Sequence, residues 1–205
     1  CYYQNQVSCP DFDVIGLSFP GCPGFPHFGH NRHVAWCVTH AGADYQDLFI
    51  EKFDEDNLSV YEWKGDKLGA EIKRETIEVA GAEDETVEVR VTRHGPIIGE
   101  SKDGRMGLAF KYTSTEAPNQ GFNSLIPQMT SNSIDDAESA MKEWVDPCNN
   151  YVFADVHGDI RYLNRGKVPI RSMANAWLPV PGWTGEHEWL GNIPFDQLAR
   201  ITNPD

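Results

Sequence analysis

The sequence predicts a β-rich α+β fold. Most segments with a clear pattern alternate in side-chain character or are rich in β-branched and aromatic residues, which is typical of strands. Only one segment has a clear helical period, and it lies between a capping serine and a proline. After residue 169 the chain is rich in Pro, Gly and Trp, and the periodicity fades. These features favour sheets with a small helical part.

The predicted strands fall mainly in the first half of the chain. Residues 87–91 alternate strictly between valine and charged residues, which suits a sheet with one wet face. Lys102-Asp103-Gly104 is a suitable turn before the last of these strands, which we expect to pair nearby. The predicted strands cover residues 13–18, 33–39, 47–53, 58–63, 72–79, 87–91 and 106–112.

The predicted helix begins after Ser133, whose side chain can cap it, and has Asp135 and Asp136 in its first turn. It is expected to stop before Pro147. The apolar positions at helical spacing are Ile134, Ala137, Met141 and Trp144. A hairpin is predicted next, with strands at 151–156 and 159–163.

The segment after residue 169 is predicted to be an ordered loop that packs on a partner surface, because its tryptophans require burial. The 205 residues, of which 40% are hydrophobic, suffice for a globular unit or for part of a larger domain.

Composition also limits the possible partners. The net charge of −14 disfavours binding to nucleic acid and to anionic membranes. No apolar run approaches the roughly 18 residues of a membrane span. The first residues lack the pattern of a signal peptide, so any export signal is expected upstream of Cys1.

The five cysteines predict no disulfide framework. They are odd in number and lack CxxC spacing, so neither a disulfide scaffold nor a zinc knuckle is predicted, although one pair remains open. They are Cys1, Cys9, Cys22, Cys37 and Cys148.

Two groups of residues are candidates for metal binding. His27, His30 and His33 could supply three zinc ligands, but their spacing suits neither a strand nor a helix, so this reading is disfavoured. Asp44 and Asp47, with a backbone carbonyl between them, are the hard oxygen ligands that Ca²⁺ prefers. Taken alone, these residues favour a solvated turn.

Two further features leave alternatives open. No GxSxG or SxxK motif is present, but Cys1 could be an N-terminal nucleophile whose own amine is the base, or simply the first residue of the sequence. Asn149-Asn150 could present an amide to a ligand or form a turn before a strand.

Blocks of sequence along the whole chain resemble the penicillin acylase (penicillin amidase) family, although residues 58–91 carry little of the resemblance. The early blocks are 16–24 (GLSFPGCPG), 28–31 (FGHN), 34–36 (VAW) and 44–51 (DYQDLFIE). The later blocks are 94–98 (HGPII), 151–155 (YVFAD), 158–160 (GDI), 166–171 (GKVPIR), 188–191 (EWLG), 193–196 (IPFD) and 203–204 (NP).

The resemblance implies a four-layer αββα N-terminal nucleophile hydrolase, of which residues 1–205 are an internal part of the β chain. Such enzymes are precursors that cut themselves into α and β chains and expose a serine as nucleophile. The α chain, the rest of the β chain and a small acyl amide are therefore the expected partners. The expected location is periplasmic or extracellular. Cys1 then falls within an interior strand.

The family's site residues can be placed on this sequence by the same resemblance. The backbone N–H of His40 corresponds to one oxyanion donor, and the second donor, an asparagine, would lie beyond Asp205. Phe28 corresponds to an aromatic residue of the acyl pocket, although a plain core phenylalanine is an equal reading. Asn149 falls near another pocket position. The calcium ligands correspond to Asp44, the carbonyl of Gln46, Asp47 and the backbone of Ala176.

The expected activity is hydrolysis of a side-chain acyl amide through an acyl-enzyme on a serine outside this chain. The substrate could be a β-lactam antibiotic, an N-acyl homoserine lactone or a similar compound. An N-terminal cysteine hydrolase using Cys1 and a non-catalytic calcium-binding β module remain alternatives.

Overall fold

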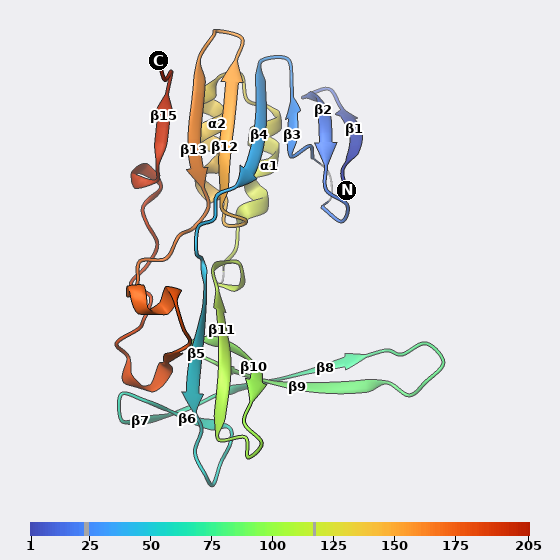
Figure 1. The fold of residues 1–205 in the computed structure, drawn as a ribbon. Coiled ribbons are helices and arrows are strands. Elements are labelled where there is room, and N and C mark those ends of the chain that lie inside the picture. Colours follow the sequence, from blue (N-terminus) through green and yellow to red (C-terminus); the bar gives the residue numbers. More distant parts are fainter. Residues whose placement is uncertain (23–24, 117) are drawn as a thin grey trace. The chain divides into compact units, whose positions relative to one another are not determined.

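The computed structural model describes residues 1–22, 25–116 and 118–205. The chain forms two compact units, each built from separate stretches of sequence (Figure 1). Unit 1 comprises Cys1–Ala43, Glu116–Val168 and Asn192–Asp205, and unit 2 comprises Asp44–Thr115 and Pro169–Gly191.

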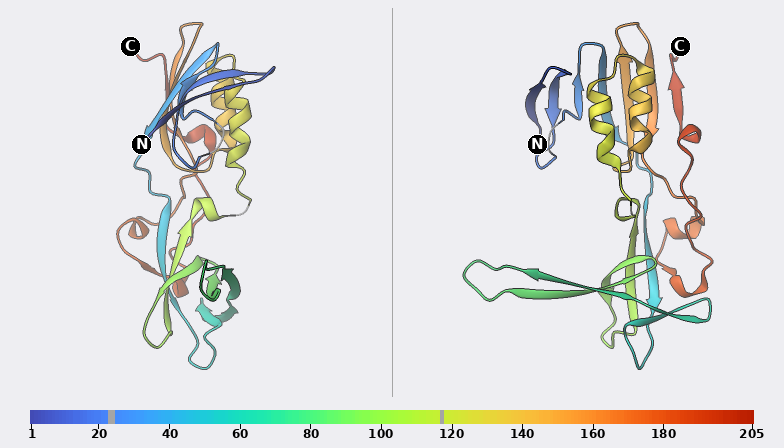
Figure 2. Two further views of the ribbon diagram at one scale, coloured as in Figure 1. Left: turned by 90° about the vertical axis from the view of Figure 1, so that its right-hand side faces the viewer. Right: turned by 180° about the vertical axis from the view of Figure 1, so that it is seen from behind.

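Unit 1 contains a seven-stranded antiparallel sheet in the order β1-β2-β3-β4-β12-β13-β15. The helices α1 (Leu125–Met129) and α2 (Ile134–Ala140) lie on one face of it (Figure 2). The strands are β1 (Tyr3–Ser8), β2 (Asp13–Ser18), β3 (Phe28–His30), β4 (Val34–His40), β12 (Asn149–Asp155), β13 (Ile160–Arg165) and β15 (Arg200–Thr202).

The core of unit 1 lies between the sheet and these helices. In β4, Val34, Trp36 and Val38 are buried, and the residues between them are exposed. Tyr151 and Phe153 of β12 pair with Val38 and Trp36 and lie on the same face. The period of two therefore gives the sheet one face packed on helices and one open face.

The helix predicted after Ser133 is present but shorter than expected. The Ser133 side chain accepts a hydrogen bond from the backbone N–H of Asp136, as a cap should. The α-helix ends at Ala140, and a 3₁₀ turn, Met141–Glu143, follows. Residues three apart align in a 3₁₀ turn, which keeps Met141 and Trp144 buried together. The five-residue helix α1 is too short to show a period in the sequence.

Unit 2 contains a six-stranded sheet in the order β14-β5-β11-β10-β9-β8, and a separate hairpin, β6-β7. β14 is parallel to β5, and the other pairs are antiparallel. The strands are β5 (Gln46–Lys52), β6 (Val60–Trp63), β7 (Asp66–Gly69), β8 (Glu71–Ile77), β9 (Glu85–Thr92), β10 (Gly95–Glu100), β11 (Met106–Tyr112) and β14 (Val180–Pro181).

Short 3₁₀ turns complete the two units. They are η1 (Thr113–Thr115), η2 (Gly121–Ser124), η3 (Met141–Glu143), η4 (Met173–Ala176), η5 (Gly182–Thr184) and η6 (Phe195–Gln197). All seven strands predicted in the first half of the chain are present within a few residues, as is the hairpin of β12 and β13. No helix in the described part of the chain has the length and apolar character needed to cross a membrane.

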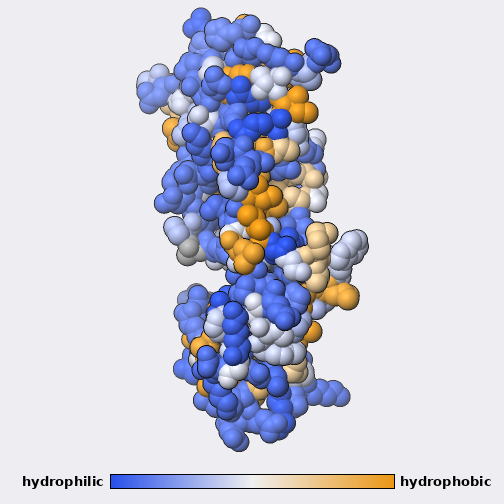
Figure 3. All heavy atoms as spheres, turned by 90° about the vertical axis from the view of Figure 1, so that its left-hand side faces the viewer, coloured by the Kyte–Doolittle hydropathy of each residue, from blue (hydrophilic) through white to orange (hydrophobic). Residues whose placement is uncertain are grey.

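The loop after residue 169 is ordered in unit 2, but its tryptophans are not all buried. Trp183 and Trp189 are half-buried, whereas Trp177 is 77% exposed in this chain. Leu178 and Leu190 are also exposed. Figure 3 shows apolar side chains on the surface on this side of the molecule. Packing of this loop on a partner stays a prediction.

Candidate functional site

Three polar residues lie in register at one end of the sheet of unit 1. Asn149, at the start of β12, pairs with His40 at the end of β4 and with Arg165 at the end of β13. Paired residues present their side chains on the same face of a sheet. This row of three residues therefore lies at the end of the face that the helices cover. His40 is exposed, whereas Asn149 and Arg165 are buried.

The backbone N–H of His40 points away from β12. The N–H of Ala41 donates to the carbonyl of Cys148 at 3.2 Å, which makes His40 and Asn149 a non-hydrogen-bonded pair of the ladder. On its other side, β4 pairs with β3 only through Ala35 and Trp36. The N–H of His40 therefore faces a side of β4 where β3 has already ended, and no backbone acceptor for it is found among residues 1–22, 25–116 and 118–205.

The carbonyl of the same residue is held in place. The side-chain amide of Asn150 donates to the carbonyl of His40 at 3.2 Å and to Oγ1 of Thr39 at 3.0 Å. The strand end that carries the N–H of His40 is therefore fixed by a side chain of the neighbouring strand, and the donor is pre-oriented.

Phe28 lies on the open face of the sheet near this end. It pairs with Leu17, which is 41% exposed, and is itself half-buried. Its ring centroid is 5.4 Å from that of Tyr2 and 6.0 Å from that of Phe19. By register it lies three residues from His40, about 10 Å along the strand. An apolar, partly exposed aromatic cluster is thus close to the N–H of His40.

Asn149 is occupied by a structural task. Its Oδ1 accepts hydrogen bonds from Nε and Nη2 of Arg165 at 3.2 and 3.0 Å. The Arg165 guanidinium is 1% exposed and lies 3.9 Å from the ring centroid of Trp144 and 4.8 Å from that of Tyr151. Burial lowers the pKa of Arg165 to about 10. Asn149 belongs to β12, so its reading as part of a turn is wrong.

The three histidines proposed for zinc have different environments. His27 is buried between the rings of Phe19 and Phe25, and His30 is exposed at the end of β3. Burial, followed by the charge of Arg165, lowers the pKa of His27 to about 4, so its imidazole is neutral near pH 7. Within residues 1–22, 25–116 and 118–205, no group of three or more His, Cys, Asp or Glu side chains is arranged to hold a metal.

The acidic loop lies in unit 2 and is held by three donors. Arg171 forms ion pairs with Oδ2 of Asp44 at 2.7 Å and with Oδ2 of Asp47 at 2.6 Å. Asn175 donates to the same Oδ2 of Asp47 at 3.1 Å, and so does the indole N–H of Trp189. The other oxygen of Asp47, Oδ1, is buried and has no hydrogen-bond partner among the described residues.

This arrangement fits a hard cation. Arg171 pairs with Oδ2 of Asp47, but the buried Oδ1 still requires a donor or a cation of its own. Gln46 is the first residue of β5 and precedes Asp47. Ala176 follows Asn175, which donates to Asp47. The segments that carry the carbonyls of Gln46 and Ala176 therefore both lie next to Asp47. Two carboxylates and carbonyl oxygens are ligands that Ca²⁺ accepts, although they are too few to complete its coordination.

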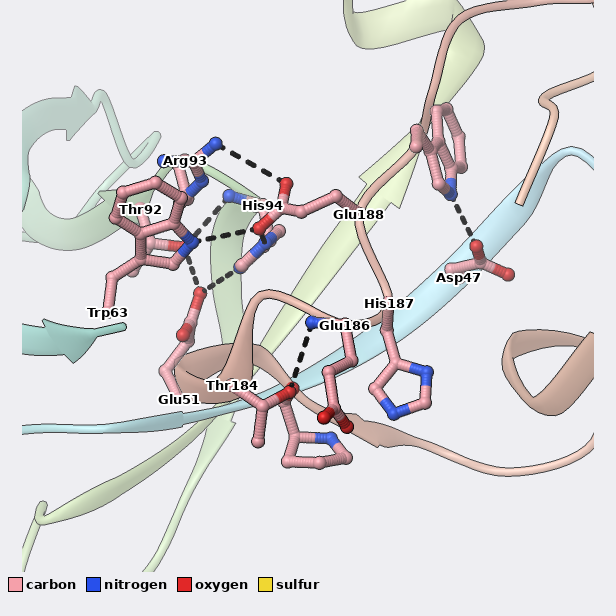
Figure 4. Close-up of polar contacts among 12 residues, drawn as sticks. Asp47, Glu51, Trp63, Thr92, Arg93, His94, Thr184, Glu186, His187 and Glu188 are labelled. Carbon is pink, nitrogen blue, oxygen red and sulfur yellow. Dashed lines mark hydrogen bonds and ion pairs between the residues drawn. The ribbon is translucent and has the colours of Figure 1, made fainter. Parts of the chain in front are cut away.

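A second polar cluster in unit 2 is centred on a fully buried histidine (Figure 4). Nδ1 of His94 is 2.7 Å from Oε1 of Glu51, and its Nε2 is 3.0 Å from Oε1 of Glu188. The imidazole stacks on Phe49 at 4.0 Å with an interplanar angle of 3°. We call Glu51, His94 and Glu188 the Glu–His–Glu cluster.

Further hydrogen bonds surround the cluster. Oε1 of Glu51 also accepts from the hydroxyl of Thr92 at 2.7 Å, and Oε1 of Glu188 accepts from the indole of Trp63 at 2.9 Å. Each of these two oxygens therefore has a second partner besides the ring of His94.

Glu188 is ionised in this setting. Burial alone would raise the pKa of Glu188, but hydrogen bonds from Trp63 and His94, with the charges of His94 and Arg93, outweigh burial and hold this pKa below its usual value. Nη2 of Arg93 lies 3.4 Å from Oε2 of Glu188. The sequence analysis did not select this cluster, although each of its three members falls in a block of the family resemblance.

Comparisons with known proteins agree with the resemblance. The penicillin amidase family model matches residues 1–205. The chain is 39% identical to penicillin acylase 2 proenzyme of Pseudomonas sp. (strain SE83), over 99% of this chain and 26% of that protein. It is 28% identical to the acyl-homoserine lactone acylase QuiP of Pseudomonas fluorescens, over 96% of this chain and 25% of that protein. The chain thus spans about a quarter of the length of these relatives.

A solved structure shows the same fold. The chain superposes on thermostable penicillin G acylase from Alcaligenes faecalis with a TM-score of 0.87 and 24% identity, over 99% of this chain and 36% of that one. The strand-rich architecture with few helices, as predicted, is therefore the fold of the matching part of that penicillin G acylase. With the family model matching throughout, this chain belongs to the penicillin amidase family.

Proposed function

We propose that the protein containing this chain is an amidohydrolase of the penicillin acylase type. The observation that supports this best is the backbone N–H of His40, which points away from β12 and has no backbone acceptor in the described part of a chain whose whole length matches the family. A donor in that position can meet the negative charge that develops on a carbonyl oxygen during acyl transfer.

In the proposed reaction a serine outside this chain attacks the amide carbonyl. Its α-amine takes the hydroxyl proton and passes it to the leaving amine, and an acyl-enzyme forms that water then hydrolyses. The His40 N–H donates to the oxyanion of each tetrahedral intermediate, together with an asparagine side chain that is also outside this chain. Because the His40 donor belongs to the backbone, the exposed imidazole is not required for it.

The aromatic cluster at Phe28 suits an apolar acyl group. Phe28, Tyr2 and Phe19 offer ring faces and edges, which attract phenyl and alkyl groups. We propose acyl amides as the substrate class, such as the side chain of a β-lactam antibiotic or an N-acyl homoserine lactone. We also propose that Asn149 shapes the pocket indirectly through Arg165, because its Oδ1 is occupied.

We further propose that calcium binds at the acidic loop, held by Asp44, Asp47 and the carbonyls of Gln46 and Ala176. Its contribution is structural, since a cation there neutralises the buried carboxylate and ties strand β5 to η4. The site lies in unit 2, and the proposal is supported by the unpartnered Oδ1 of Asp47.

The α chain and the remainder of the β chain are the proposed partners. The face of the seven-stranded sheet without helices exposes Leu17, Val152 and Ile160. An apolar sheet face of this kind requires a covering layer, which the missing segments would supply. The proposed periplasmic or extracellular location rests on the family resemblance alone, and fractionation of the producing cells would test it.

The test is an assay of the intact protein and of the 205-residue chain on chromogenic phenylacetyl and long-chain acyl anilides and on N-acyl homoserine lactones. We expect turnover of at least one substrate by the intact protein and none by the chain alone. Turnover by the chain alone would contradict a nucleophile outside it.

Two other outcomes would favour the alternatives. If thiol alkylation mapped to Cys1 abolished activity, the cysteine would be the nucleophile. If the intact protein formed no acyl-enzyme with a mechanism-based acylating probe, the non-catalytic calcium-binding module would be favoured over an enzyme.

A further inference from the structure

The loop that follows η5 is attached to β5 at two places through adjacent residues. Glu188 contacts His94, which in turn contacts Glu51 of β5. The next residue, Trp189, donates its indole N–H to Asp47 of the same strand. The side chain of Glu188 is therefore connected to Glu51 through His94, and that of Trp189 binds Asp47 directly.

The two attachment points belong to one buried face. Asp47, Phe49 and Glu51 alternate along β5 and are all buried. Asp47 and Glu51 are four residues apart, about 13 Å along the strand. Phe49 lies between them and carries the stacked ring of His94. One face of β5 thus connects the Glu–His–Glu cluster to the acidic loop.

The cluster has little freedom to move. His94 and Glu51 have fully buried side chains, and both nitrogens of His94 are committed. A Cβ atom on Gly182 would lie 2.5 Å from Oε2 of Glu51 and 3.1 Å from Nδ1 of His94, so the backbone of η5 closes tightly over the pair. Glu188 is consequently held at one defined position.

Asp47 depends on its own contacts in the same way. Arg171, Asn175 and Trp189 all bind Oδ2, so together they set the rotation of the carboxylate and turn Oδ1 away from the donors. Residues that hydrogen-bond a metal ligand typically change metal affinity by roughly 10- to 100-fold when they are altered.

We infer that the Glu–His–Glu cluster is a positioning device: it holds the loop at Glu188 so that Trp189 binds Oδ2 of Asp47 and leaves Oδ1 directed at a cation. This inference rests on the proposed calcium site. Glu51, His94 and Glu188 touch no candidate ligand themselves and act on Asp47 through Trp189.

The first experiment is a titration of the intact, calcium-stripped protein with Tb³⁺, followed through luminescence excited at tryptophan and repeated by calorimetry with Ca²⁺. Glu188→Gln keeps the size of the side chain and removes its charge, and Trp189→Phe removes the indole donor. We expect each to weaken binding roughly tenfold. By calorimetry, the matched control Glu186→Gln, an exposed residue of the same loop, should bind like the wild type.

The outcomes separate the inference from the calcium proposal. If the wild type binds neither ion, the calcium proposal fails. The positioning role is overturned if the wild type binds but Glu188→Gln and Glu186→Gln have equal affinities. It is also overturned if Trp189→Phe weakens binding and Glu188→Gln does not.

A second measurement tests the cluster without a metal. The indole N–H of Trp189 should exchange slowly with solvent, as followed by NMR. In Glu188→Gln the indole should exchange faster, whereas in Glu186→Gln it should not. Unchanged exchange in Glu188→Gln would contradict the inference.

Discussion

The two units bury a basic side chain in different ways. In unit 1 the guanidinium of Arg165 lies between the rings of Trp144 and Tyr151 and donates to an amide oxygen, with no carboxylate within ion-pair distance in the described chain. In unit 2 the imidazole of His94 lies between two carboxylates. The first side chain is surrounded by aromatic faces, and the second is part of a paired network.

The difference follows from the size of the two cores. Unit 1 has a broad apolar cluster between its sheet and helices, whereas the fully buried apolar cluster of unit 2 consists of Phe49, Ala109 and Val180. A small apolar core leaves specific polar contacts to define how loops pack. Unit 2 should therefore depend more on its buried charges than unit 1 does.

The largest effect is expected for His94→Leu. Removing the imidazole leaves the buried Glu51 and the half-buried Glu188 without their shared partner, and removing one partner of a buried pair in this way costs about 3–5 kcal/mol. The free energy of unfolding, measured with denaturant on the intact protein, should fall by this amount. A loss below about 1 kcal/mol would show that unit 2 does not depend on the pair.

The next effect concerns the backbone donor of unit 1. His40→Pro removes the backbone N–H without breaking a bond to β12, because His40 and Asn149 form a non-hydrogen-bonded pair. Loss of one oxyanion donor typically lowers kcat by about 10²- to 10³-fold. His40→Ala keeps the N–H and should stay within a few-fold of the wild type. Equal kcat values for the two variants would exclude the donor role.

Acid should affect the two units over different pH ranges. His27 of unit 1 is neutral when folded, and its pKa is lowered to about 4 from 6.5. The unfolded chain therefore binds the proton first, and stability falls as the pH drops from 6.5 toward 4, by roughly 2–3 kcal/mol. In unit 2 the pKa of Glu188 is lowered. The stability that its ionised form contributes is therefore fully present above the usual carboxyl pKa and is lost as the pH falls through the lowered pKa.

Denaturant unfolding at several pH values should show this separation. His27→Gln should flatten the dependence between pH 6.5 and 4, and Glu188→Gln should flatten it only at lower pH. If His27→Gln retained the full wild-type dependence between pH 6.5 and 4, the buried neutral imidazole would not be its source.

The smallest effect is expected for Arg165→Met. The change leaves Oδ1 of Asn149 without its donors, but it also removes a buried charge that has no carboxylate partner. These terms oppose each other, and the net loss of unfolding free energy should be about 1 kcal/mol or less. A loss as large as that of His94→Leu would remove the distinction between the two units.

The sequence predicted the strands better than the site. Side chains alternate in the sequences of β4 and β9, and β5 contains a run of apolar residues, so the positions of these strands could be predicted. β3 and β15 are only three residues long, and α1 contains five, so none of them shows a period.

The polar clusters follow from contacts between distant segments. Asp47 could be recognised from the resemblance, but Arg171, Asn175 and Trp189 are more than 100 residues away in sequence. Glu51 and Glu188 are 43 and 94 residues from His94. Nothing in the local pattern shows that these side chains meet, because the packing of the segment after residue 169 on β5 and its neighbours brings them together.

The interleaving of the two units also has a consequence for how the chain is made. The chain leaves unit 1 after residue 43, returns at 116, leaves again after 168 and returns at 192. A ribosome therefore releases part of each unit before the other is complete, and β15 can join β13 only after residue 202 has emerged. Such non-local pairing slows folding and leaves strand edges exposed meanwhile. Neither unit can be produced by simple truncation, and a chaperone that shields β13 during synthesis should raise the yield.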